Sequence, residues 1–413
     1  MKRTPLTLLA AASAVTLALA GCSPKATTAN GDGDGSVKTG TGIVDGTIHL
    51  GMLVDLSGPF AAIGTELSQS AQLYWEQRNA DGGVCGRFPV VLDVKDNAYN
   101  VQTTVSLYAE MSSTVLAFQN VLGSAPTSAL AQSLADDDML VVTHGQGQEL
   151  LGDPHILITG ATFDVEAMNG LGYLLEKGLI AEGDVIGHIY LEGAYGEGVR
   201  EGAELFADAH GMTIAPIQVT PAISDLTPAI ADLTSKGVSA VVLSTSPPQL
   251  ASAAGAAQAA GLDVPLLGST PTWTAGLLST PSAEALKEHL YVAFPVASFE
   301  NDDAAAFREA YVAAHADEDP SLQIVLEYSE AKALDAVLEQ ACANGDLTPA
   351  GVVAAREELT TVETGVTPTL GLSDPARAAT AEEYITRAAE VPGGLEVVVG
   401  PYASADAKKH VAR

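Results

Sequence analysis

The chain has 413 residues, of which 51 are acidic and 19 are basic, so its formal net charge at pH 7 is −32. A surface this acidic is a poor partner for nucleic acids and anionic membranes, and it favours solubility. The length is enough for two domains, and no stretch after the N-terminal region approaches the roughly 18 consecutive apolar residues of a membrane-spanning helix.

The first predicted element is a targeting segment. Lys2 and Arg3 precede an apolar stretch over residues 6–20, and Gly21 and Cys22 follow. This order is typical of a secretory signal peptide. The letters LAGC at 19–22 resemble a lipobox, so we predict a signal peptide over residues 1–21 and a diacylglycerol anchor on Cys22. An ordinary signal peptide with an incidental cysteine is the alternative. The anchor would hold the protein at the extracytoplasmic face of the cell membrane.

The next two regions differ in pattern. Residues 22–46 are rich in Gly, Ser, Thr and Asp, which predicts a flexible linker. From Thr47 onward, short runs of Val, Ile and Leu alternate with longer amphipathic stretches, which predicts βα units and parallel sheets. The predicted strands cover residues 48–54, 90–94, 115–119, 140–143, 156–159, 185–190, 213–219, 240–244, 265–268 and 291–294. The predicted helices cover residues 61–80, 101–113, 124–135, 165–177, 197–210, 226–236 and 249–260.

After residue 294 the pattern becomes mainly helical. Helices are expected over 302–315, 324–343 and 348–357, and the last has Thr348 as its N-cap and Pro349 in its first turn. Residues 364–392 are rich in Thr, Pro and Ala, and their pattern assigns no element. A final strand is expected over 395–399.

Six stretches carry a family resemblance, in the right order and spacing. They are IHLGMLVDLSGPFAAIGTELSQSAQLYWEQRNADGGVCGR from residue 48, VVLDVKDNAYNVQTTV from 90, VLGSAPTSALA from 121, AYGEGVREGAELFADAHGM from 194, LTPAIADLTSKGVSAVVL from 226 and AGLDVPLLGS from 260. Together they resemble the type I periplasmic binding proteins, above all the branched-chain amino-acid and amide class that serves ABC importers.

The resemblance implies an α/β fold of two doubly wound parallel-sheet lobes joined by three crossovers, with ligand between them. The crossovers are expected near 159–162, 284–291 and 363–368. Lobe 1 would comprise residues 47–160 and 286–365, and lobe 2 residues 161–285 and 366–413. In open parallel sheets, ligands bind at the carboxyl ends of the strands, which agrees with this placement.

Three loops carry the ligand contacts that the resemblance implies. DLSGPFAAIG at 55–64 brings Phe60 to a helix N-terminus, or is a plain connector. GSAPTSA at 123–129 offers the hydroxyl of Ser124 and the adjacent amide of Ala125 to a ligand carboxylate, although helix capping alone would explain a serine. Tyr195 aligns with the family tyrosine that covers the ligand from lobe 2, or packs in a loop.

Other positions depart from the amino-acid binders of the family. Gln146 and Gly147 stand where an Ala-Thr or Ser-Thr pair is usual, and Thr270 stands where many members carry an acid against the ligand ammonium. A neutral threonine cannot offset a buried cation. Trp273 either forms a pocket wall or is a packed core aromatic.

We therefore predict a ligand with a hydrogen-bonding head and no obligatory ammonium, such as an amide, a small carboxylate or an aromatic acid. Amino acids remain the alternative, because an acid such as Glu192 or Asp225 could still reach the cleft.

The same resemblance predicts how the cysteines are paired. With Cys22 lipidated, Cys85 and Cys342 are the pair left in an oxidising compartment. The family fold places both of their segments in lobe 1, which implies a Cys85–Cys342 disulfide. Two buried free thiols are the alternative.

Enzymatic readings find little support. The sequence lacks a G-x-S-x-G, H-E-x-x-H or P-loop motif, and His144 has no His or Cys at metal-ligand spacing, so we expect a structural role for it. We expect no cofactor, no metal, no nucleic-acid partner and a monomeric receptor that delivers its ligand to ABC permease subunits. A sensor that signals to a membrane partner without transport is the alternative, and a secreted enzyme is a third.

Overall fold

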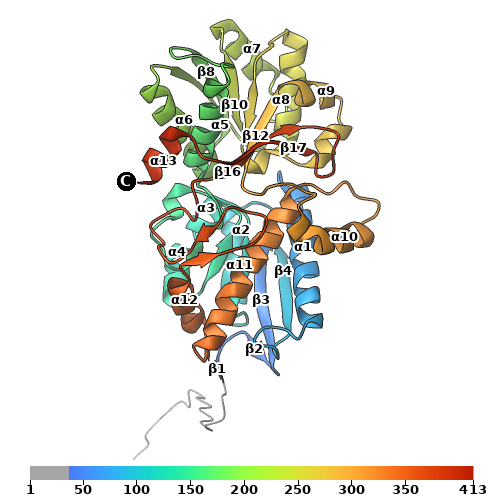
Figure 1. Ribbon diagram of the computed structural model, residues 1–413, viewed down its shortest axis with the longest axis vertical. Coiled ribbons are helices and arrows are strands. Elements are labelled where there is room, and N and C mark those ends of the chain that lie inside the picture. The colour runs from blue at the N-terminus through green and yellow to red at the C-terminus, as the bar shows by residue number, and fades with distance from the viewer. Residues whose placement is uncertain (1–36, 413) are drawn as a thin grey trace, which may run out of the picture. The chain divides into compact units, whose positions relative to one another are not determined.

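The computed structural model describes residues 37–412, so the predicted signal peptide and the lipidation at Cys22 lie outside the described residues. Two large sheets organise this part of the chain (Figure 1). The first sheet has the strand order β2-β3-β5-β6-β7, and β4 also pairs with β3. Its strands are β2 (Ile43–Val44), β3 (Thr47–Val54), β4 (Val90–Asp96), β5 (Ala117–Val121), β6 (Val141–Thr143) and β7 (Ile156–Leu157). Apart from β2, its strands run parallel.

The second sheet has seven strands in the order β17-β16-β12-β11-β10-β8-β9. They are β8 (Val185–Leu191), β9 (Thr213–Val219), β10 (Ala240–Ser244), β11 (Leu266–Gly268), β12 (Leu290–Phe294), β16 (Glu383–Ala388) and β17 (Leu395–Tyr402). Strands β8 to β12 are parallel, whereas β16 runs antiparallel to both β12 and β17. The predicted α/β class with parallel sheets is confirmed.

Helices connect and cover the strands (Figure 1). They are α1 (Ala61–Ala80), α2 (Val101–Met111), α3 (Ser124–Ser128), α4 (Ala131–Asp137), α5 (Phe163–Glu176), α6 (Ala194–Ala209), α7 (Thr227–Lys236), α8 (Pro247–Ala260), α9 (Ala283–His289), α10 (Ala305–Ala314), α11 (Gln323–Ala343), α12 (Pro349–Glu358) and α13 (Ala405–Val411). Thr348 caps α12 as predicted, since its hydroxyl accepts the N–H of Gly351 at 3.2 Å. No helix among residues 37–412 has the length and apolar character needed to cross a bilayer.

The helix predicted over 124–135 is wrong as a single element. The N–H of Leu130 bonds the carbonyl of Thr127 at 2.9 Å, three residues back. This tighter hydrogen bond ends α3 at Ser128, and a separate helix, α4, begins at Ala131.

The predicted linker over 22–46 is too long. Residues 38–39 form β1 (Lys38–Thr39), which pairs in parallel with β13 (Asp346–Leu347), and β2 pairs with β3. Gly42 lies so close to the chain that an added Cβ would approach the amide nitrogen of Leu116 to 1.9 Å. The Gly- and Thr-rich composition is typical of a coil, but here it permits close backbone pairing. Residues 37–46 are therefore part of the fold.

Two of the three predicted crossovers also need correction. The chain passes from β7 in the first sheet to α5, which packs on the second, between residues 157 and 163. It returns only after Phe294, not over 284–291, because β12 pairs with strands of the second sheet on both sides. It crosses again between Ala379 and Glu383 rather than at 363–368, since the carbonyl of Ala379 still accepts the N–H of Gly371 on β15 at 2.8 Å. Val362 and Leu370, on the paired strands β14 (Thr361–Val362) and β15 (Leu370–Gly371), pack in a core with residues of the first sheet.

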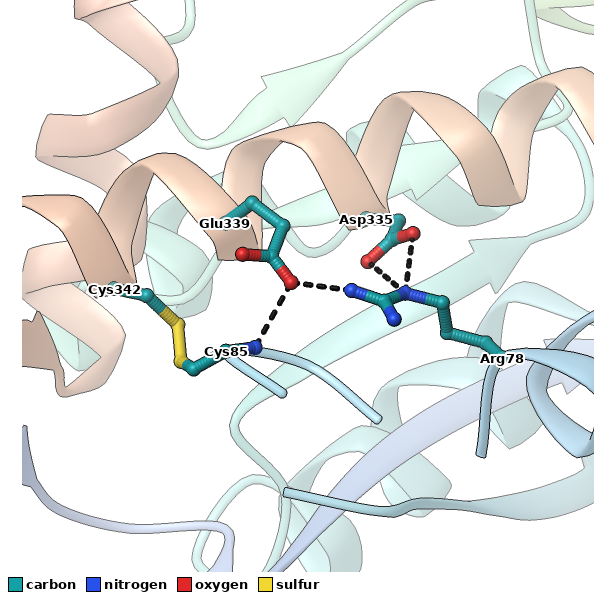
Figure 2. Close-up of a disulfide and its surroundings, with 5 residues drawn as sticks. All are labelled: Arg78, Cys85, Asp335, Glu339 and Cys342. Carbon is teal, nitrogen blue, oxygen red and sulfur yellow. Dashed lines mark hydrogen bonds and ion pairs between the residues drawn. A yellow bond between two sulfur atoms is a disulfide. The ribbon is translucent and has the colours of Figure 1, made fainter. Parts of the chain in front are cut away.

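A disulfide joins Cys85, just after α1, to Cys342 near the end of α11, with a Cα–Cα distance of 5.9 Å (Figure 2). The predicted pairing is confirmed. The N–H of Cys85 donates to Oε1 of Glu339 at 2.8 Å, and Arg78 from α1 pairs with both Glu339 and Asp335 (Figure 2). These contacts hold the late helix α11 against the first helix.

Candidate ligand-binding site

A narrow and almost filled cavity lies where strand ends of both sheets meet; its empty space, open solvent included, is about 230 Å³. The residues that line it from the first sheet follow β3, β4, β5 and β6; they are Phe60, Tyr99, Leu122, Gly123, Ser124, His144 and Gly145. The second side supplies Phe163 from α5, Tyr195 after β8 and Pro271 after β11. Apart from α5, each of these segments follows the carboxyl end of its strand. Parallel sheets bind ligands at this edge.

The loop between β3 and α1 is held by a buried carboxylate. Asp55 accepts the N–H groups of Ser57 at 3.2 Å and Gly58 at 2.5 Å through Oδ1, and that of Phe60 at 2.8 Å through Oδ2. This fan of bonds positions Phe60 at the start of α1, where its ring is 2% exposed and faces the cavity. The structure thus places Phe60 in the wall of the cavity.

Tyr99 is a cavity residue that sequence reasoning missed. Its backbone is left-handed, with φ of 52°, and its N–H donates to Oδ1 of Asn97 at 2.9 Å. Its ring centroid lies 4.6 Å from that of Phe60. Gly123, at φ of 104°, approaches this ring so closely that a Cβ would come within 2.5 Å of it. The polar stretch DNAYN after a strand was the available signal for such a turn.

Two buried polar atoms on the wall lack hydrogen-bond partners among the described residues: Oγ of Ser124 and Nε2 of His144. Ser124 is the first residue of α3 and is fully buried. Ala125, next to it, is not among the residues that line the cavity. His144 contacts Oε1 of Glu330 through Nδ1 at 3.1 Å, and burial lowers the pKa of its ring to about 4. A merely structural role was expected for His144, whereas the structure places it in the cavity wall.

Behind His144 lies a buried pair of acids on α11. Glu327 accepts from Nε2 of Gln119 at 2.8 Å, and Nδ2 of Asn120 donates to both Glu327 and Glu330, at 2.6 and 2.7 Å. Both glutamates are fully buried. Burial raises the pKa of Glu330 to about 8, and burial together with the neighbouring Glu330 raises the pKa of Glu327 well above its usual range. Both shifts favour the protonated form of each acid.

Tyr195 forms the opposite wall. It is 4% exposed, and its ring centroid lies 4.9 Å from that of Phe163 and 6.4 Å from that of Phe60. Its hydroxyl hydrogen-bonds Oγ of Ser269 at 2.5 Å. The aromatic contact between Tyr195 and Phe60 joins the two sides of the cavity directly.

Two other predicted residues, Gln146 and Thr270, do not line the cavity but contact residues beside it. The carbonyl of Gln146 accepts the N–H of Phe163 at 2.8 Å. Thr270 turns toward Glu166, which accepts both its N–H, at 2.9 Å, and its hydroxyl. Because residues 270–272 form a 3₁₀ turn, the adjacent Pro271 reaches the cavity in its place.

Trp273 is a packed core aromatic, the second of the two alternatives. Its side chain is fully buried, and Nε1 lies 3.4 Å from the carbonyl of Gly393. Its own carbonyl, like that of Thr270, accepts from Nε2 of Gln323, at 3.1 and 2.9 Å. These two bonds link α11 to the segment that follows β11.

The cavity carries no formal charge on its walls, since none of its lining residues is Asp, Glu, Lys or Arg. Glu192 and Asp225, the acids that could have met an ammonium, are exposed and do not line it. A further buried acid is Glu166, which accepts the N–H of Thr270, next to Pro271 in the cavity wall, and has an unpartnered Oε2. Burial and the neighbouring Glu383 raise its pKa well above the usual range, which favours the neutral acid.

A larger groove, with about 1270 Å³ of empty space that includes open solvent, lies elsewhere on the surface. Leu278, Phe299, Val312 and Val391 contribute to its walls, and it contains none of the predicted site residues. Over residues 37–412, no three His, Cys, Asp or Glu side chains are grouped so that they could hold a metal ion.

Comparison with known proteins agrees with this geometry. The family profile of periplasmic binding proteins matches residues 47–392. The chain belongs to the periplasmic binding protein family. The resemblance found in the sequence is thereby confirmed, and the family is one of substrate-binding proteins rather than enzymes.

A similar solved structure is that of a fatty acid ABC transporter substrate-binding protein from Thermomonospora curvata. It is 34% identical, covers 91% of this chain and 97% of its own, and has a TM-score of 0.88. A branched chain amino acid ABC transporter structure from Thermus thermophilus with bound valine shares the fold at 16% identity, with a TM-score of 0.79 over 89% of this chain and 99% of that one.

A curated relative, a Leu/Ile/Val-binding protein from Rhizobium johnstonii, is 26% identical over 201 residues. That match covers 47% of this chain and 53% of the relative, so it spans about half the length of the curated protein.

Proposed function

We propose that this protein is an extracytoplasmic receptor that captures a small carboxylic acid or amide with an apolar body and delivers it to an ABC permease. The observation that carries the proposal is the pair of unpartnered, buried polar atoms, Oγ of Ser124 and Nε2 of His144, on the wall of an uncharged, largely aromatic cavity. A ligand that places its oxygen atoms there would satisfy both groups, and its apolar part would contact Phe60, Phe163 and Tyr195.

The charge of the walls disfavours an α-amino acid. An ammonium needs a carboxylate partner when it is buried, and the cost of leaving it unpaired is several kcal/mol, each ~1.4 kcal/mol being tenfold in affinity. None of the lining residues supplies that partner. The name of the similar Thermomonospora curvata protein, which refers to fatty acids, also favours a carboxylic acid.

Amino acids remain a second candidate because of one observation. Oε2 of Glu166 is buried without a partner, and this acid bonds Thr270, next to Pro271 in the cavity wall. If Glu166 ionised when a ligand bound, it could pair with an ammonium. The names of the Thermus and Rhizobium proteins refer to branched-chain amino acids.

Binding by closure of two lobes is part of the proposal. We divide the described residues into one lobe of 37–157 and 305–379 and another of 163–294 and 383–412, following the sheets rather than the boundaries first expected. Phe60, Phe163 and Tyr195, which line the cavity from both sides, are at most 4% exposed, so we propose that the lobes separate to admit a ligand. Contacts that a ligand makes to both sides would then favour the closed form.

The remaining parts of the proposal concern location. The LAGC motif supports lipidation at Cys22 after removal of residues 1–21. The Cys85–Cys342 disulfide supports an oxidising, extracytoplasmic compartment. We propose a monomer that is attached to the membrane only through its lipid and has no nucleic-acid partner.

Three ligands with one carbon skeleton test the ligand class: 4-methylpentanoate, its primary amide and leucine. We expect calorimetry to show binding of the acid or the amide, with leucine at least about a hundredfold weaker, since its ammonium finds no partner. Ser124→Ala should weaken binding of the acid by about tenfold, because one oxygen of the ligand then loses a hydrogen bond. Tighter binding of leucine than of 4-methylpentanoate would favour the amino-acid candidate instead.

A cellular measurement separates transport from sensing. Deleting the protein should abolish uptake of the labelled ligand if the protein serves a permease. Normal uptake combined with a lost transcriptional response would support the sensor alternative.

A further inference from the structure

A continuous line of buried polar side chains runs from the cavity wall into the first sheet. His144 contacts Glu330, Asn120 bridges Glu330 and Glu327, and Gln119 joins Glu327 to the indole of Trp75, with each contact between 2.6 and 3.1 Å. Every member is buried, and the most exposed, His144, reaches only 3%. One end of this line is His144, which lines the cavity; its Nε2 has no hydrogen-bond partner among the described residues, although the side chain of Gln323 lies near the ring.

The charges in this line do not balance without a proton. No Lys or Arg in the described part of the chain pairs with Glu327 or Glu330, and the only ion-pair partner of the two acids there is the ring of His144. Two ionised carboxylates that share one amide donor would repel each other in a buried site. The line therefore consists of groups that hold, and can redistribute, one or more protons beside the ligand cavity.

We infer that His144 binds the head group of the ligand, and that the Glu327–Glu330 pair behind it enables the site to take up one proton when a carboxylate ligand binds. This inference rests on the proposed function. A carboxylate brings one negative charge into a cavity whose walls offer no Lys or Arg. One proton from solvent compensates that charge: Nε2–H donates to the ligand, and Nδ1–H donates to Glu330. The ligand is not altered, and the net change is one carboxylate plus one proton bound.

The groups around His144 fit this assignment. From α11, Glu327 and the side chain of Gln323 favour the protonated ring, and they oppose the effect of burial. From the loop after β4 and from α6, Tyr99 and Tyr195 face the same cavity; burial raises the pKa of each, so both stay neutral. Glu330 is therefore the one acid in direct contact with the ring among the described residues.

The test compares 4-methylpentanoate with 4-methylpentanamide by calorimetry at about pH 6, 7 and 8, in buffers with different ionisation enthalpies. With the wild-type protein, binding of the acid should take up about one proton, and its Kd should weaken by about tenfold per pH unit. The amide is neutral, so it should bind with no proton uptake and with a Kd that does not change with pH.

Variants then locate the proton. His144→Gln keeps a hydrogen-bonding group but should abolish proton uptake with the acid, and the Kd of both the acid and the amide should then be independent of pH. Glu330→Gln should weaken the acid at least about tenfold at pH 6 and lower its proton uptake, while the Kd of the amide stays independent of pH. His188→Gln is the matched control. This histidine is equally buried, bonds Ser244 at 2.8 Å and does not line the cavity, so proton uptake should remain.

The outcomes separate the two proposals. If acid and amide both bind but the wild-type protein takes up less than about 0.3 protons with the acid, the assignment of His144 and the acid pair is wrong while the proposed function stands. If neither ligand binds at any pH, the proposed function fails and the inference fails with it. If His144→Gln does not fold, the buffer comparison on the wild-type protein still decides.

Discussion

The disulfide offers the most direct test of how the fold is stabilised. Replacing both cysteines, Cys85→Ser and Cys342→Ser, removes a covalent link between residues separated by 257 positions. The loop-entropy relation gives about 5.5 kcal/mol for a loop of this size as an upper figure. The contacts of Arg78 with Asp335 and Glu339 persist in the variant and still hold the two helices together. We therefore expect a loss of about 2–5 kcal/mol in the free energy of unfolding.

Ligand binding should be almost unaffected by the same change. Helix α1 has 20 residues, and at ~1.5 Å per residue it separates Phe60 at the cavity from the cysteine end by about 30 Å. Urea titrations followed by the fluorescence of Trp75 and Trp273 measure the loss, and calorimetry checks that Kd changes by less than about twofold. In the wild type, alkylation without reductant should leave both cysteines unmodified. A loss below about 1 kcal/mol, or alkylation of both thiols without reductant, would refute the reasoning.

Three further predictions follow from single contacts. Gly123→Ala should lower the free energy of unfolding by about 1–3 kcal/mol and weaken ligand binding, because φ of residue 123 is 104° and the new Cβ would meet the ring of Tyr99. Urea titration measures the loss of stability, and calorimetry measures the change in Kd. The melting temperature should fall as pH rises from about 5 to 8, because burial raises the pKa of Glu383 from 4.5 to about 8, so the folded state holds a proton that the unfolded chain releases. Glu383→Gln should reduce this dependence of the melting temperature on pH, and an unchanged dependence would contradict the assignment. Thr348→Ala should cost about 0.5–2 kcal/mol through loss of its cap on α12, whereas Thr348→Ser should restore most of it.

Much of the fold could be predicted from local pattern. Helix α1 begins and ends where predicted, over 61–80, between a Gly-Pro turn and an Asp-Gly-Gly end, and its buried Ile63, Leu67, Ala71 and Trp75 recur every four residues. Strand β16 was missed because its letters, EYITRA, mix charged and apolar residues. It is a strand because β12 and β17 supply hydrogen-bond partners on both sides, and such partners are not visible in a local pattern.

The candidate site, too, could be predicted only in part from the sequence. Phe60, Ser124 and Tyr195 stand in loops that follow predicted strands, and the family resemblance assigns them ligand contacts from the sequence alone. Metal-ligand spacing by itself predicts only a structural role for His144. The environment of this histidine depends on Glu330, which is 186 positions away in the chain. Trp273 could not be decided from sequence, since a buried tryptophan serves equally well in a core or in a pocket wall.

Helix α11 connects the disulfide, the acid pair behind His144 and the contacts with the segment that follows β11. Its second half is held to α1 by Cys342 and by the contacts of Asp335 and Glu339 with Arg78 (Figure 2). Its middle carries the acid pair behind His144, and its first residue, Gln323, donates to the carbonyls of Thr270 and Trp273 beside the second sheet.

In the proposed opening, the disulfide end of α11 stays with the first lobe, and the two hydrogen bonds of Gln323 are among the contacts that must break. The same helix therefore positions the group that binds the ligand and contacts the opposite lobe. A ligand bound against His144 favours the arrangement in which Gln323 keeps both bonds, which connects recognition of the head group to closure.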